Sequence, residues 1–118
     1  RSVGCDVLPI KQFRSVYVFK EYITKWKHTM FDLTGFQRDV LYVINGLDEP
    51  HGLAIKSELE EYYEKEIHHG RLYPNLDTLV DKGLVDKGQL DKRTNYYTVT
   101  NRGDREIEAR DDWEAQYR

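Results

Sequence analysis

Apolar residues recur at helical spacing along most of this chain, and residues 67–85 carry the clearest pattern. Apolar positions at i, i+4, i+7 and i+8 are typical of a helix face that is buried in a core. Here they are Leu72, Leu76, Leu79 and Val80. A polar set at i, i+4, i+7 and i+11 falls on another face of the same helix and consists of Arg71, Asn75, Thr78 and Lys82. We therefore predict a helix over residues 68–82, with His68 as its N-cap and Gly83 as its stop.

Pro74 is the residue that argues against this helix. A proline inside a helix has no backbone N–H, so the carbonyl of Gly70 would lose its partner and the first turns could kink. The apolar stripe nevertheless continues on both sides of the proline. We expect the helix to run through it.

Two further helices are predicted upstream. The T-x-x-Q sequence of residues 34–37 matches a capping box, in which the side chains of Thr34 and Gln37 bond to each other's backbone. It predicts a helix that runs to about residue 46, followed by a run of turn-forming residues. A second helix is expected over residues 52–65, with Ile55, Leu59 and Tyr62 facing inward and Tyr63 as a further inward candidate.

From residue 84 the spacing of apolar and polar residues changes from a helical to a strand-like pattern. Residues 84–90 and 95–100 are rich in strand-forming side chains, and the polar residues 91–94 between them predict a hairpin with Lys92 and Arg93 at its tip. Thr100 is a good N-cap for a last helix over residues 101–118, although Gly103 weakens its start. Three helices followed by a hairpin form the order of a winged helix-turn-helix domain, so the fold class is mostly α with a small β-hairpin.

Both ends of the chain carry large apolar side chains that the compact domain does not need. Residues 9–27 predict an aromatic helix, and the last helix repeats apolar positions at i, i+4 and i+8. Such surfaces on terminal helices usually contact a partner. We assign residues 1–30 to an N-terminal extension with a dimerisation helix, 31–100 to the winged domain and 101–118 to a C-terminal dimerisation helix. The expected interface residues are Phe13, Tyr17, Phe19, Ile23, Trp26, Ala109, Trp113 and Tyr117.

Charge changes this picture in one respect. The chain has 118 residues and a net charge of −3, whereas nucleic-acid-binding domains are usually basic. Six basic and two acidic side chains lie in residues 1–31, which leaves a net charge of −7 for the rest. An acidic body with local basic groups suits a protein that works at high salt, where the release of counterions contributes little affinity.

Four segments carry a resemblance to the PadR-type winged-helix transcriptional regulators. They are Pro50-His51-Gly52, Gly70-Arg71-Leu72-Tyr73-Pro74, Lys82-Gly83-Leu84-Val85, and residues 95–100 with Arg102-Gly103. The match covers about residues 34–107, and within the family the chain looks especially similar to the members from halophilic archaea that regulate the response to reactive oxygen species. The family keeps a proline inside the corresponding helix. The chain departs from many members at His68-His69, which leaves the start of that helix open.

The resemblance implies a homodimer on a roughly palindromic operator, usually as a repressor, that responds to oxidative stress. The small-molecule pocket found in some members is not carried over, because no motif of this chain marks it, and the effector stays unknown. We expect double-stranded DNA as the partner and no cofactor.

The residue types indicate which side chains would meet the duplex. Arg71 and Asn75 can each bond bidentately to a base edge. Backbone contacts are expected from groups in the predicted helices and at the hairpin tip, and the tip could also enter the minor groove. These residues are Thr34, Arg38, His68, His69, Tyr73, Thr78, Lys82, Lys92 and Arg93.

Two other functions remain open from the residues. His51, His68 and His69 could gather around a metal ion, although adjacent histidines on a helix point in different directions and no metal-binding motif is present. The winged domain could instead bind an acidic protein. No phosphate loop or catalytic spacing indicates an enzyme. We also expect a cytoplasmic protein, because Cys5 is the only cysteine and no run of 18 apolar residues or signal peptide pattern occurs.

Overall fold

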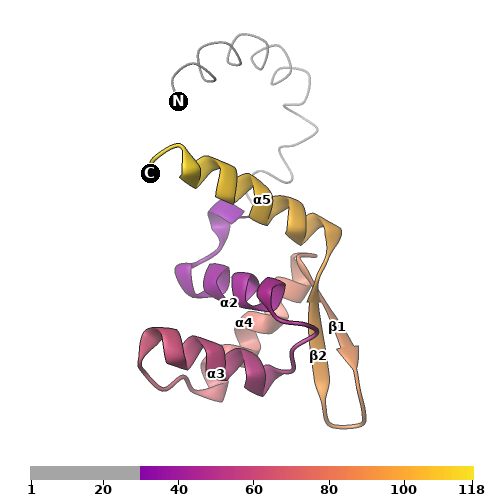
Figure 1. Ribbon diagram of the computed structural model, residues 1–118. Helices are drawn as coiled ribbons and strands as arrows, with labels where there is room; N and C mark the ends of the chain where they lie inside the picture. The colour runs from indigo at the N-terminus through magenta and orange to yellow at the C-terminus, as the bar shows by residue number, and fades with distance from the viewer. Residues whose placement is uncertain (1–29) are drawn as a thin grey trace.

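The computed structural model describes residues 30–118, and the helix expected over residues 9–27 lies outside this range together with Phe13, Tyr17, Phe19, Ile23 and Trp26. Within it, helices and a two-stranded hairpin follow one another as in a winged helix (Figure 1). The elements are α2 (Gly35–Gly46), α3 (Gly52–Tyr63), α4 (His69–Asp81), β1 (Val85–Gln89), β2 (Asn95–Val99) and α5 (Asn101–Ala115). The predicted fold class is confirmed for this part of the chain.

The capping box at the start of α2 is confirmed. The Thr34 hydroxyl accepts from the backbone N–H of Gln37 at 3.1 Å, and the Gln37 side chain accepts from the backbone N–H of Thr34 at 3.1 Å. Two N–H groups that the first turn cannot pair internally are thereby satisfied. The buried face of α2 then enters the core through Phe36, Val40, Leu41 and Ile44.

Helix α4 runs through Pro74 without interruption, as the apolar stripe predicted. Leu72, Leu76 and Leu79 are fully buried. His68 occupies the N-cap with an extended backbone, but its side chain makes no capping bond. Gly83 follows with a φ of +79°, a left-handed conformation that glycine adopts without steric cost.

The hairpin is hydrogen-bonded to the segment just before α3. β1 and β2 are antiparallel, with Val85 opposite Val99 and Gln89 opposite Asn95. The backbone N–H of Tyr97 also donates to the carbonyl of Pro50 at 2.9 Å. A lone hairpin is marginally stable in water, so this bond and the buried Tyr97 ring hold the wing against the helices.

The first half of helix α5 packs into the core of the domain. The Thr100 hydroxyl caps it by accepting from the Gly103 N–H at 3.0 Å and donates to the Gly83 carbonyl at 2.7 Å. Gly103 and Ile107 are buried, and Met30 joins the same core from the other end. The core therefore extends beyond residues 31–100 on both sides.

One inward position was predicted wrongly. Tyr62 is 77% exposed, whereas Tyr63 packs against the core and its hydroxyl donates to Asp39. Tyr63 lies at i+4 from Leu59 and at i+8 from Ile55, which is the centre of the buried stripe. Tyr62 lies one residue, or about a quarter turn, to the side of it.

Candidate nucleic-acid interface

The polar stripe of α4 lies along one flank of the helix. The positions opposite its buried leucines are Gly70, Pro74, Asp77 and Asp81, and all four are exposed. In the predicted stripe only Arg71 is exposed, while Asn75, Thr78 and Lys82 are half-buried. The sequence prediction therefore identified a polar face correctly but placed it too far from the core.

Arg71 is presented on an aromatic platform. Its guanidinium carbon lies 4.1 Å from the centroid of the Phe36 ring, which belongs to the buried face of α2. Stacking on a ring limits the positions of the guanidinium while its N–H donors at the edge remain available. The support from α2 could not be inferred from the spacing within α4.

Asn75 is engaged within the protein. Its side-chain oxygen accepts from the Gln37 amide at 2.8 Å, and its side-chain N–H donates to the Arg71 carbonyl at 2.6 Å. The first bond joins α4 to the start of α2. The amide would have to exchange both bonds before it could bond bidentately to a base. Thr78 is similar, because its hydroxyl donates to the Pro74 carbonyl at 3.0 Å.

The other flank of α4 faces the wing. Tyr73 stacks on His69, with ring centroids 5.7 Å apart and planes 13° apart. Tyr73 also lines a cavity together with Arg93 from the hairpin tip. The first half of α4 and the hairpin tip therefore line one cavity, and the tip lies at the end of the domain away from α5 (Figure 1).

The hairpin tip is shaped by Asp91. Its carboxylate accepts from the backbone N–H groups of Arg93 and Thr94, both at 2.8 Å. These two bonds lower the pKa of Asp91 below its usual value. Lys92 and Arg93 are both exposed on this fixed turn.

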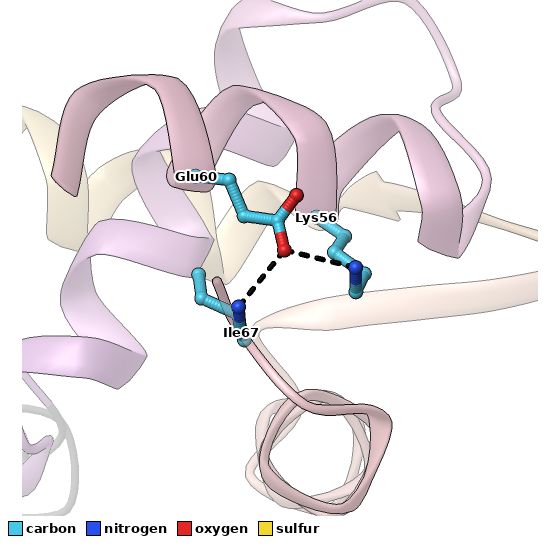
Figure 2. A network of polar contacts seen from close by, with 3 residues as sticks. All are labelled: Lys56, Glu60 and Ile67. Atoms are coloured by element: carbon cyan, nitrogen blue, oxygen red, sulfur yellow. Dashed lines mark hydrogen bonds and ion pairs between the residues drawn. The ribbon is translucent and has the colours of Figure 1, made fainter. Parts of the chain in front are cut away.

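The turn between α3 and α4 is fixed by Glu60, a residue that the sequence did not single out. Its carboxylate accepts from the backbone N–H of Ile67 at 2.8 Å and from the Lys56 ammonium at 2.9 Å (Figure 2). The bond from Ile67, and then that from Lys56, lower the pKa of Glu60. Ile67 is buried directly before the N-cap of α4, so Glu60 positions the start of that helix.

The remaining expected contact residues lie at two helix starts and one helix end. Thr34 is exposed at the start of α2 with its hydroxyl used as the cap, and Arg38 is half-buried one turn later. His68 and His69 are exposed at the start of α4, whereas Lys82 is its C-cap. A further cation is Lys87 of β1, whose Nζ lies 3.8 Å from Oδ1 of Asp77 in α4.

Helix α5 carries an aromatic surface at its outer end. Trp113 is 50% exposed and Tyr117 is 71% exposed, and their ring centroids are 5.2 Å apart. The Arg110 guanidinium lies 4.8 Å from the Trp113 ring. Ala109 is exposed on the same helix.

Two further findings concern residues 30–118 alone. No group of three or more histidine, cysteine or acidic side chains is arranged there to hold a metal ion. No helix in this range is both long enough and apolar enough to cross a bilayer.

Comparison with known proteins identifies the family. The profile of the transcriptional regulator PadR-like family matches residues 40–109. The structure of H. salinarum RosR grown from NaBr is 55% identical, covers 73% of this chain and 77% of its own, and superposes with a TM-score of 0.70. A complex of the same protein named RosR-S1 gives the same identity and TM-score over 73% of this chain and 76% of its own.

More distant structures share the fold. Reduced AbfR of Staphylococcus epidermidis bound to DNA is 22% identical over 92% of this chain and 77% of its own, with a TM-score of 0.58. No curated protein matches the sequence significantly. The PadR match, the RosR identity and the winged-helix architecture agree with the resemblance seen in the sequence, and the chain belongs to the PadR-like family of transcriptional regulators.

Proposed function

We propose that this chain is a sequence-specific DNA-binding regulator that acts as a homodimer on a roughly palindromic operator. The observation that carries the proposal is the placement of α4 beside the wing tip. Tyr73 of the helix and Arg93 of the tip line one cavity, and the tip lies at the end of the domain away from α5 (Figure 1). A winged helix reads DNA with its third helix in the major groove while the wing contacts the adjacent backbone.

Arg71 is the proposed base-reading residue. Its guanidinium is exposed and held over Phe36, and a fork of N–H donors of this kind suits the O6 and N7 acceptors of guanine. Asn75 is the second candidate, although it must first release Gln37 and the Arg71 carbonyl. In the unbound protein Asn75 therefore joins the backbone of Arg71 to the Gln37 side chain of α2.

The remaining cations and donors are proposed to contact phosphates. They lie along α4 from its N-cap to its C-cap, at the start of α2 and at the wing tip, and comprise Thr34, Arg38, His68, His69, Tyr73, Thr78, Lys82, Lys92 and Arg93. The same helix also carries two exposed acidic side chains, Asp77 and Asp81. Such mixed charge gives weak long-range steering and reduces binding to random DNA.

Dimerisation is proposed to use α5. Support comes from Trp113 and Tyr117, which form an exposed aromatic pair on a helix whose first half is anchored in the core. Two such helices, each joined rigidly to its winged domain, would fix the spacing of the two recognition helices on an operator. Ala109 on this helix would leave room for close packing.

The signal is proposed to be oxidative stress in a halophilic cell. Support comes from the 55% identity to H. salinarum RosR and from the net charge of −3. The only cysteine, Cys5, lies outside the described residues, and one thiol cannot form an intramolecular disulfide. We expect Cys5→Ser to leave a peroxide response intact; a lost response in a reporter assay would assign the sensing to that thiol.

The test is fluorescence anisotropy with the upstream region of the protein's own gene and with a random duplex, over a range of salt. Arg71→Ala is expected to weaken specific binding by about 1–3 kcal/mol with little effect on the random duplex. Arg71→Lys should behave similarly, because it keeps the charge and loses the fork. Arg118→Ala, beyond the end of α5, serves as the control for lost positive charge.

Equal losses on both duplexes would show that Arg71 does not read a base. An absence of binding to either duplex at any salt concentration would instead favour a winged domain that binds an acidic protein.

A further inference from the structure

Two side-chain amides form a chain of hydrogen bonds between α2 and α4. The Gln37 amide N–H donates to the Asn75 side-chain oxygen at 2.8 Å, and the Asn75 amide N–H donates to the Arg71 carbonyl at 2.6 Å. The oxygen of Gln37 accepts from the backbone N–H of Thr34 at 3.1 Å, as part of the capping box. The chain of bonds therefore begins at a backbone donor of the α2 N-cap and ends at a backbone carbonyl of α4.

The two backbone groups fix the direction of both amides. A backbone N–H can only donate, so the oxygen of Gln37 faces Thr34 and its nitrogen faces Asn75. A backbone carbonyl can only accept, so the nitrogen of Asn75 faces Arg71 and its oxygen faces Gln37. Each end imposes the same arrangement independently. Turning the Asn75 amide around would set two donors against each other at one end and two acceptors at the other.

This arrangement decides which end of Asn75 is offered to a groove. Its oxygen is bonded to the half-buried Gln37, whereas its nitrogen is bonded beside the exposed Arg71. The nitrogen carries two N–H groups, and the Arg71 carbonyl uses one of them. Asn75 can therefore offer an N–H to a base while both bonds are kept, whereas bidentate pairing with adenine requires both to break.

We propose that Gln37 is a specificity-determining residue that acts through Asn75. By bonding the Asn75 oxygen, it makes α4 a donor at this point. A donor suits the acceptor edges of guanine, thymine and adenine N7, but not cytosine, whose major-groove edge carries only the N4 donor. The neighbouring Phe36 supports the Arg71 guanidinium from the same turn of α2. The assignment rests on the proposed function, because it requires α4 to lie in a major groove.

The variant Gln37→Glu reverses the hydrogen-bonding role of this position and keeps the cap. Glutamate accepts from the Thr34 N–H in a capping box as glutamine does, and its charge suits a helix N-terminus. The variant should therefore melt at about the wild-type temperature. The carboxylate cannot donate, so the Asn75 amide turns its nitrogen towards it and presents its oxygen instead. Gln89→Glu is the matched control, because it adds the same charge at an exposed position of the wing.

Affinity is measured by anisotropy for the upstream region of the protein's own gene and for duplexes in which each base pair of the bound segment is replaced in turn. At one position the wild type is expected to bind cytosine about fivefold more weakly than the other bases, which is the factor that one neutral hydrogen bond contributes. Gln37→Glu should lose this discrimination at that position alone. Gln89→Glu should weaken binding to every duplex alike and keep the base profile.

Repeating the measurement in Asn75→Ala separates positioning from a general effect. There Gln37→Glu should leave the base profile unchanged, because the residue through which it acts is absent. A change of profile that persists in Asn75→Ala would overturn the proposal. So would an unchanged profile when Asn75 is present.

The bond itself is followed without DNA, by NMR of the Asn75 side-chain N–H signals. Gln37→Glu should shift both signals and Gln89→Glu should not. If the signals shift but the wild type binds no duplex preferentially, the proposed function fails and the specificity role fails with it. If the wild type binds its upstream region specifically while neither the signals nor the base profile change in Gln37→Glu, only the role of Gln37 is refuted.

Discussion

Gly103→Ala provides a sharp test of how α5 is joined to the domain. In an isolated helix this substitution stabilises by about 1 kcal/mol, because alanine restricts the unfolded chain more than glycine does. Here the added Cβ would overlap the Leu84 carbonyl oxygen, and it would lie 2.8 Å from the Val99 methyl carbon Cγ1 and 3.2 Å from the Leu84 carbonyl carbon. The two Leu84 atoms belong to the backbone, which cannot rotate out of the way.

The expected result is a net loss of stability. Overpacking against a rigid neighbour costs about 3 kcal/mol, at the upper end of the usual range. Subtracting the helix preference of about 1 kcal/mol leaves a destabilisation of about 2 kcal/mol. For a domain of this size that lowers the melting temperature by about 8 °C.

Gly46→Ala is the matched control. Gly46 is the last residue of α2, it is exposed, and nothing lies within 4 Å of an added Cβ. This variant should be as stable as the wild type or more stable, by up to about 1 kcal/mol. Both variants are melted at one protein concentration, since dimerisation would make the transition concentration-dependent. If Gly103→Ala were as stable as Gly46→Ala, the close packing of α5 on Leu84 and Val99 would be refuted.

Three further predictions address the cap, the turn and the terminal helix. Thr34→Ala should destabilise the protein by about 1 kcal/mol in urea unfolding, because it removes the acceptor for the Gln37 N–H; an unchanged midpoint would contradict the capping role. Glu60→Gln keeps an acceptor oxygen for Ile67 but loses the charge. Since bonding lowers the pKa of Glu60 from its ordinary 4.5, the wild type should be the more stable at pH 7, and its advantage should fade as pH falls below that value; an advantage that persists at pH 3 would exclude this origin. Trp113→Ala should leave the unfolding of the winged domain intact while shifting sedimentation towards monomer, and Asp112→Ala should not; a persistent dimer would place the interface elsewhere.

The local pattern of the chain was sufficient to predict the elements. The Thr34 and Gln37 side chains form a capping box because both partners lie within one helical turn. The stripe of leucines predicted α4 correctly despite Pro74, because burial of a whole face outweighs one missing backbone bond. The family resemblance, which the comparisons confirmed, also depends on local pattern. The segments that carry it are short and specify turns, caps and close contacts.

The environment of each polar side chain could not be predicted in the same way. Helical periodicity gives the angle of Arg71 around its own axis, but not the Phe36 ring of α2 on which it stacks. For Asn75 the sequence suggested a free amide, and the tertiary contact with Gln37 engages it. The sequence did not single out Glu60, because its partner, the Ile67 N–H, lies seven residues away and reaches it only through the turn.

The sequence by itself determined the order and type of the elements, because caps, stripes and turns depend on interactions among residues that are close along the chain. The tertiary structure decided which polar groups remain available, because their partners come from distant segments. It also made Gly103 a packing requirement where the sequence suggested a weak helix start. Finally, only the approach of α3, α4 and the wing created the cavity that Tyr73, Arg93 and Tyr97 line together.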